Sequence, residues 1–63
     1  MLDENELKVY TYLQEKPDSK TLDIANSTGT KPRTVRAVIS RLIDKGLVIK
    51  NGAGKNTTYS LVE

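Results

Sequence analysis

Residues 21–50 read TLDIANSTGTKPRTVRAVISRLIDKGLVIK, and this stretch decides the fold because it marks the start and the end of two successive helices. Thr21 is a good N-cap, and Gly29 is the residue expected where a helix ends in the left-handed conformation. Directly afterwards, Pro32 suits the first position of a longer helix and Gly46 the position after its end. Two helices joined by so short a turn must be neighbours at a steep angle, so the stretch predicts a helix-turn-helix.

The residues before this stretch predict a first helix over positions 3–16. Asp3 can cap its first turn, and Glu6 stands three residues later, as in a capping box. Pro17 ends the helix because the residue before a proline is pushed out of the helical region. A single apolar stripe at helical spacing indicates a one-sided surface helix. The stripe consists of Leu2, Val9 and Leu13, with Tyr10 beside it.

The residues after Gly46 predict a β-hairpin. LVIKN at 47–51 and TTYSLV at 57–62 are both β-prone and roughly alternating, and GAGK at 52–55 supplies turn residues between them. The glycines allow positive φ at the tip of the hairpin. The order is therefore helix, helix, helix and hairpin, which is an α+β fold in a single domain of residues 1–63.

The hairpin loop, NGAGKNTT at 51–58, also resembles a phosphate-binding loop of the form G-x-x-x-x-G-K-[ST]. In such a loop one glycine opens the turn, and the hydroxyl after the lysine binds magnesium. Here Ile49 stands in place of the first glycine and Asn56 in place of the hydroxyl. We therefore interpret the loop as a hairpin turn and expect no nucleotide there.

The composition excludes several classes of site. The 63 residues include no cysteine and no histidine, so disulfides and the common zinc sites are excluded, and neither a metal nor a cofactor is predicted. No nucleophile is paired with a histidine base and no acid cluster has metal-site spacing, so we do not expect an enzyme. No apolar run approaches a membrane span, and the acidic start MLDENE is unlike a signal peptide, so we expect a cytoplasmic protein.

The net charge of +2 is distributed unevenly along the chain. Up to Asp18 there are five acidic and two basic residues, whereas from Ser19 onward there are eight basic and three acidic residues. The part of the chain after Asp18 is therefore where a polyanion would bind.

The predicted helix over residues 32–45 has an apolar side and a polar side, and the polar side suits the major groove of DNA. Arginine can donate a bidentate pair to guanine, serine can bond either way, and a small alanine allows close approach. The N-terminal half of such a helix reaches deepest into the groove. The expected base contacts are Arg33, Arg36, Ala37 and Ser40, whereas Val35, Val38, Ile39 and Leu42 form the apolar side with Ile43 at its edge.

Other residues near this helix are expected to contact the DNA backbone. Lys31 and Thr34 lie near the helix start, where backbone N–H groups are exposed, and Arg41 lies farther along, nearer a phosphate. The alternative is that the arginines form a solvated face, as most helical charge runs do. The preceding tight turn, the basic hairpin and the presence of a single acid, Asp44, on the polar side favour nucleic-acid contact.

Taken together, residues 21–50 resemble the winged helix-turn-helix DNA-binding domains. The resemblance is carried by a threonine cap, an Ile-Ala pair, a glycine turn, a Thr-Val pair opening the recognition helix and a closing L-x-x-K-G-L-[IV] motif. It implies that the recognition helix, 32–45, enters the major groove of double-stranded DNA. It also implies that the wing, 50–59, lies on the backbone or in the minor groove, with Lys50 and Lys55 as backbone contacts.

Two positions depart from the family pattern. Thr30 stands where the family usually has an apolar residue in the turn, and Lys31 stands where a Ser or Asp normally caps the recognition helix. A cation at the positive end of the helix dipole costs about a few tenths of a kcal/mol. A bound phosphate would offset that cost. The alternative is that Thr30 caps a helix shifted by one residue.

The aromatic residues indicate core and contact positions. Tyr10 and Tyr59 are expected in the core. Tyr12 lies off the apolar stripe of the first helix and, with Leu7, could belong to a contact between subunits. If a homodimer forms, the first helix is its expected surface, and the DNA target would be a palindrome with half-sites about one helical turn apart.

Two functions remain open from the sequence. The first is a small transcriptional regulator that binds double-stranded DNA and is associated with the nucleoid. The second is a winged-helix module for protein–protein interaction, or a domain excised from a larger replication or recombination protein. A steep dependence of duplex affinity on salt would distinguish the first function from the second.

Overall fold

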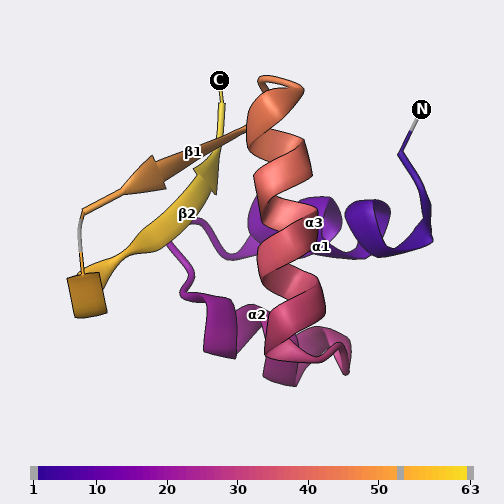
Figure 1. Cartoon of the computed structure of the whole chain (residues 1–63), viewed down its shortest axis with the longest axis horizontal. Coiled ribbons are helices and arrows are strands. Elements are labelled where there is room, and N and C mark those ends of the chain that lie inside the picture. The colour runs from indigo at the N-terminus through magenta and orange to yellow at the C-terminus, as the bar shows by residue number, and fades with distance from the viewer. Residues whose placement is uncertain (1, 53, 63) are drawn as a thin grey trace.

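The structure, a computed structural model, describes residues 2–52 and 54–62, apart from the side chain of Lys55. Three helices are followed by a two-stranded antiparallel hairpin, so the predicted α+β architecture is confirmed. The elements drawn in Figure 1 are α1 (Glu4–Glu15), α2 (Thr21–Thr28), α3 (Pro32–Asp44), β1 (Val48–Asn51), a short 3₁₀ helix (Gly54–Asn56) and β2 (Thr58–Leu61).

The start of α1 is fixed by the predicted capping box. The Asp3 carboxylate accepts a 2.8 Å hydrogen bond from the Glu6 backbone N–H, and the Glu6 carboxylate accepts a 3.1 Å bond from the Asp3 backbone N–H. Two N–H groups that the first turn would leave without partners are thereby satisfied. The helix ends at Glu15, two residues before Pro17, as that proline predicts.

The start of α2 differs from the prediction. Thr21 is the first helical residue, and the N-cap is Lys20, which makes no side-chain capping bond. Just upstream, the Ser19 backbone exchanges two hydrogen bonds with that of Tyr59, and the chain is extended up to Lys20, so Lys20 and not Thr21 is the last residue before the helix. The predicted end is confirmed, because Gly29 adopts the left-handed conformation at φ 70°.

The bounds of α3 follow the sequence signals closely. Pro32 occupies the first helical position, and Gly46, at φ 76°, follows the C-cap residue Lys45. Lys31 is the N-cap and makes no side-chain capping bond. The alternative in which Thr30 caps a shifted helix is therefore wrong.

The hairpin pairs β1 with β2 in an antiparallel register that places Lys50 opposite Tyr59. The Ser19–Tyr59 bridge adds a short extended segment beside β2, which the sequence did not indicate. At the turn, Gly52 has φ 76°, and a Cβ added there would lie 2.7 Å from the Asn56 carbonyl oxygen. Glycine is therefore required at this position both by φ and by space.

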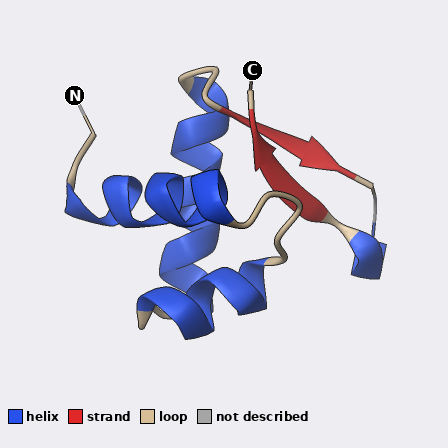
Figure 2. Cartoon of the chain, turned by 180° about the vertical axis from the view of Figure 1, so that it is seen from behind, coloured by secondary structure: helices blue, strands red, loops and turns tan. Residues whose placement is uncertain are grey.

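The core lies where the three helices meet the base of the hairpin. In Figure 1, α3 stands in front of α1, and the reverse view in Figure 2 shows α1 crossing it. No helix in the described part of the chain is long and apolar enough to cross a lipid bilayer. The fully packed core side chains are Val9, Leu13, Ile24, Ala25, Val35, Val38, Ile39, Leu42 and Val48.

The tyrosines are placed only partly as predicted. Tyr59 is half-buried and packs against the core, which agrees with the prediction. Tyr10 is half-buried but does not belong to that packed set, whereas Tyr12 does, so the predicted assignment of Tyr10 to the core is wrong. Tyr12 lines a groove with Thr28, so it lies on the side of α1 that faces α2.

Candidate nucleic-acid interface

The outer side of α3 carries the four residues predicted to contact bases. The inner side chains Val35, Val38 and Leu42 are completely buried, which fixes the rotation of the helix. All four residues predicted to contact bases are exposed, on the side of α3 opposite these buried side chains. The predicted polar and apolar sides of this helix are confirmed, and the exposed set is Arg33, Arg36, Ala37 and Ser40.

The predicted backbone contacts are distributed around this face. Lys31 is exposed at the start of α3, and Thr34 is half-buried in its first turn. Lys50 is exposed on β1. The side chain of Lys55 lies outside the described residues, so its expected contact stays a prediction.

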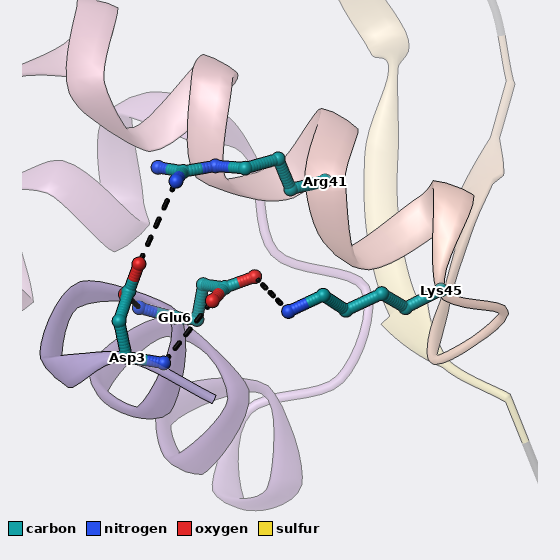
Figure 3. Close-up of polar contacts among 4 residues, drawn as sticks. All are labelled: Asp3, Glu6, Arg41 and Lys45. Atoms are coloured by element: carbon teal, nitrogen blue, oxygen red, sulfur yellow. Dashed lines mark hydrogen bonds and ion pairs between the residues drawn. The ribbon is translucent and has the colours of Figure 1, made fainter. Parts of the chain in front are cut away.

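Arg41 lies on the edge of α3 next to α1 and is engaged within the molecule. Its guanidinium lies 3.5 Å from the Asp3 carboxylate, and both side chains are about half exposed. One turn further, Lys45 donates a 2.8 Å hydrogen bond to Glu6 (Figure 3). The α1 edge of α3 is therefore neutralised internally, and Arg41 is turned away from the centre of the exposed face.

The burial of Glu6 was not predicted from the sequence, which assigned this residue only to the capping box. Glu6 is only 3% exposed. The signal was available, because Glu6 falls on the apolar stripe between Leu2 and Val9, where an acid needs a partner. The hydrogen bond from Lys45 holds the pKa of Glu6 below its ordinary value of 4.5, helped by the bond from the Asp3 N–H and opposed by desolvation.

A pocket of about 280 Å³ lies where the start of α2, the side of α3 and the hairpin meet. We call it the corner pocket. Its lining includes three cationic side chains from three different elements: Lys20, Arg36 and Lys50. Among the residues that the structure describes, none of the three lies within 4.0 Å of a carboxylate oxygen. Lys20 was given no role by the sequence reasoning, although it directly precedes the predicted start of the second helix.

Two other depressions lie away from the exposed side of α3. One, of about 630 Å³, lies between the end of α1 and the hairpin, and its lining includes Leu13, Pro17, Ile49 and Val62. The second lies along α1 and includes Leu7 and Tyr12. Neither contains a predicted DNA contact. Within residues 2–52 and 54–62, no three carboxylate side chains are grouped in a way that could hold a metal ion.

The pattern of the winged helix-turn-helix DNA-binding family matches residues 2–49. The chain belongs to this family. In its terms, α2 and α3 are the helix-turn-helix, and β1, β2 and their connection are the wing. A comparison with curated proteins gives no match.

Solved structures share this winged-helix fold over most or all of the chain. RV1404 from Mycobacterium tuberculosis has 12% identity and a TM-score of 0.91, covering 98% of this chain and 44% of that one. The PcaV transcriptional regulator from Streptomyces coelicolor has 20% identity and a TM-score of 0.89, covering 98% and 46%. The Zalpha domain of Cyprinid Herpesvirus 3 ORF112, solved with Z-DNA, has 27% identity and a TM-score of 0.85, covering 98% of both chains.

The winged-helix domain therefore spans less than half of the two bacterial proteins, whereas it spans nearly the whole of the Zalpha domain. At 12% and 20% identity the likeness to the bacterial proteins concerns the fold alone.

Proposed function

We propose that this winged-helix domain binds double-stranded DNA with α3 in the major groove and the wing on the backbone or in the minor groove. The observation that carries the proposal is the exposed side of α3, where Arg33, Ala37 and Ser40 lie together without internal partners among the described residues. An α-helix fits the major groove, and these side chains match the groups exposed there.

The contacts divide by chemistry into base and backbone sets. An arginine bonded to guanine, or a serine bonded to a donor or an acceptor on a base edge, reads the DNA sequence. Lysines contact phosphates and position the domain. For Arg41 to contact the DNA backbone, its ion pair with Asp3 must first break. The proposed base contacts are Arg33, Arg36, Ala37 and Ser40, and the proposed backbone contacts are Lys31, Thr34, Arg41, Lys50 and Lys55.

The proposal extends to transcriptional regulation and to association with the nucleoid. It is supported by the fold shared with the PcaV regulator, of which a domain like this forms less than half. The single domain over residues 1–63 is proposed as the DNA-binding unit. The alternative is a winged-helix module that binds protein, or a domain of a larger replication or recombination protein.

A homodimer through α1 is the proposed arrangement on a palindromic target. Leu7 is 54% exposed and lines the groove along α1 together with Tyr12. Glu4 and Lys8 line the same groove. Two antiparallel copies of α1 would bring Glu4 of one copy near Lys8 of the other, so the surface is complementary to itself. Sedimentation of the protein with and without a two-half-site duplex tests this arrangement.

The experiment for DNA binding is fluorescence anisotropy on duplexes selected from a random pool. Affinity is expected to fall steeply between 50 and 200 mM salt, because each neutralised phosphate releases counterions. Arg33→Ala is expected to weaken binding to the selected sequence by about 1–3 kcal/mol and to scrambled duplexes much less. The exposed Lys16, at the far end of α1, provides the control variant Lys16→Gln.

The outcomes separate the candidate functions. No binding to any duplex at low ionic strength overturns the proposal and favours the protein-interaction alternative. A left-handed Z-DNA duplex is included as a further arm, because the Zalpha domain matches this chain over almost its full length. A preference for that duplex would keep DNA binding but overturn docking of α3 in a major groove.

A further inference from the structure

The corner pocket gathers three cations that have no carboxylate partner among the described residues. Lys20 comes from the segment before α2, Arg36 from α3 and Lys50 from the wing. The two other cations on or next to α3 for which the structure gives partners, Arg41 and Lys45, have carboxylates of α1. The domain therefore neutralises one edge of α3 and leaves three like charges around a pocket at the other edge.

The positions of these cations are set by backbone hydrogen bonds. The register of the hairpin places Lys50 opposite Tyr59. The Tyr59 backbone N–H donates to Ser19 at 2.9 Å and its carbonyl accepts from Ser19 at 3.2 Å, which fixes the segment that carries Lys20. Three separate elements thus hold their cations around one pocket. These like charges repel one another, and an anion bound between them would offset that repulsion.

The other groups around the pocket also suit an anion. Thr21 and Tyr59 are half-buried and carry hydroxyl groups. The first N–H groups of α2 have no capping side chain, because Lys20 stands at the N-cap. Thr57, in contrast, donates its hydroxyl to the Gly54 carbonyl at 2.9 Å and so contributes only to the wall of the pocket. No acidic side chain lines the pocket among the described residues.

We propose that the corner pocket binds one phosphate group, held by Lys20 and Lys50 with Arg36 at its edge. This inference rests on the proposed function, in which the phosphate belongs to the DNA backbone passing between α2 and the wing. Lys20 is then a DNA contact outside both the recognition helix and the wing. By holding one strand at the corner, it positions α3 in the groove.

The first test compares Lys20→Gln with the control Lys16→Gln in duplex binding. Because a phosphate contact is blind to sequence, Lys20→Gln should weaken selected and scrambled duplexes alike, by about fivefold or more, and lower the slope of log affinity against log salt by about 1. Lys16→Gln should leave the slope unchanged. Equal behaviour of the two variants, with the wild type binding duplex, overturns the pocket while leaving the proposed function intact.

The second test uses Lys20→Ser, which separates binding from folding. Serine at the N-cap supplies the missing hydrogen bond to α2, so the melting temperature should rise while duplex affinity falls. A purely structural Lys20 would give changes of melting temperature and affinity in the same direction. A rise in both, or a fall in both, therefore overturns the proposal.

The third test uses inorganic phosphate alone and follows backbone amide signals by NMR. Shifts are expected at Thr21, Leu22 and Tyr59 in the wild type and their loss is expected in Lys20→Gln. If these shifts occur while no duplex binds, the pocket is a site for free phosphate and the proposed DNA function has failed separately. If duplex binding shifts these amides and inorganic phosphate does not, the site takes only a backbone phosphate. No shift with either ligand overturns the pocket.

Discussion

The Nζ atom of Lys45, just after α3, donates a 2.8 Å hydrogen bond to the carboxylate of Glu6, in the first turn of α1. The same carboxylate accepts the Asp3 backbone N–H at 3.1 Å and so completes the capping box. A single buried acid thus joins the cap of the first helix to the end of the third. This contact connects residues 39 positions apart and gives the fold a dependence on pH.

The free energy of unfolding should fall at acid pH because of Glu6. Its pKa is lowered from 4.5 in the folded state, chiefly by the hydrogen bond from Lys45, so folding favours the ionised form. The stabilisation is therefore complete above the unfolded-state pKa and is lost as pH falls through the lower, folded-state pKa. Urea unfolding between pH 7 and pH 2 measures it.

Glu6→Gln should be less stable than the wild type at pH 7, with the difference shrinking toward pH 2. Glu4→Gln is the control, because Glu4 lies in the same turn with its side chain 86% exposed, and its one ion pair within the described part of the chain is with Lys8 at 3.9 Å. An equal pH dependence of Glu6→Gln and the wild type would contradict the assignment.

Replacing Leu42 by alanine should destabilise the domain by about 2–5 kcal/mol, as expected for a completely buried leucine. Leu22 is 60% exposed, so Leu22→Ala should cost less than about 0.5 kcal/mol. Chemical denaturation of both variants at pH 7 provides the comparison. Similar losses for the two leucines would mean that α3 does not pack as described.

The helix-turn-helix could be predicted from the sequence because its signals are local. Pro32, Gly29 and Gly46 act through their own backbone conformation, and the apolar spacing in α3 reports one buried side. The start of α2 could not be predicted in the same way. The helix begins at Thr21 itself, one residue earlier than a cap at Thr21 would place it, and the extended segment before it pairs through Ser19 with Tyr59, a residue far away in the sequence.

For the candidate site, too, the local features could be predicted from the sequence and the contacts between elements could not. Exposure of the four predicted base contacts on α3 follows from helical spacing alone. The pairing of Arg41 with Asp3 and the gathering of Lys20 with Lys50 depend on how α1, α2 and the wing pack against α3. Charge counts along the chain indicate which half is basic, but they do not indicate which cations already have partners.

The wing should be more sensitive to substitution at Gly52 than the end of α3 is at Gly46. Both glycines have φ 76°, so alanine costs about 1 kcal/mol of strain at either position. Only at Gly52 does the added Cβ also meet a backbone atom, the Asn56 carbonyl oxygen at 2.7 Å. Gly52→Ala should therefore have the lower melting temperature of the two variants. Equal melting temperatures would contradict the described turn.

Asp3 should limit the affinity for DNA by holding Arg41. The pair is half exposed and 3.5 Å long, and exposed pairs of this kind contribute about 0.2–1 kcal/mol. Asn is as good an N-cap as Asp, so Asp3→Asn keeps the cap of α1 while releasing Arg41 to a phosphate. Duplex affinity should then rise by up to about fivefold, measured by anisotropy at low salt.

Two comparisons isolate the contact between Asp3 and Arg41 from the general loss of a negative charge. Glu4→Gln removes an equal charge in the adjacent position, where the partner is Lys8, and should raise affinity much less. In an Arg41→Ala background, Asp3→Asn should have no more effect than Glu4→Gln, because the guanidinium that it releases is absent. An increase that persists in that background would show that Asp3 acts through the overall field of the domain, and that Arg41 makes no phosphate contact.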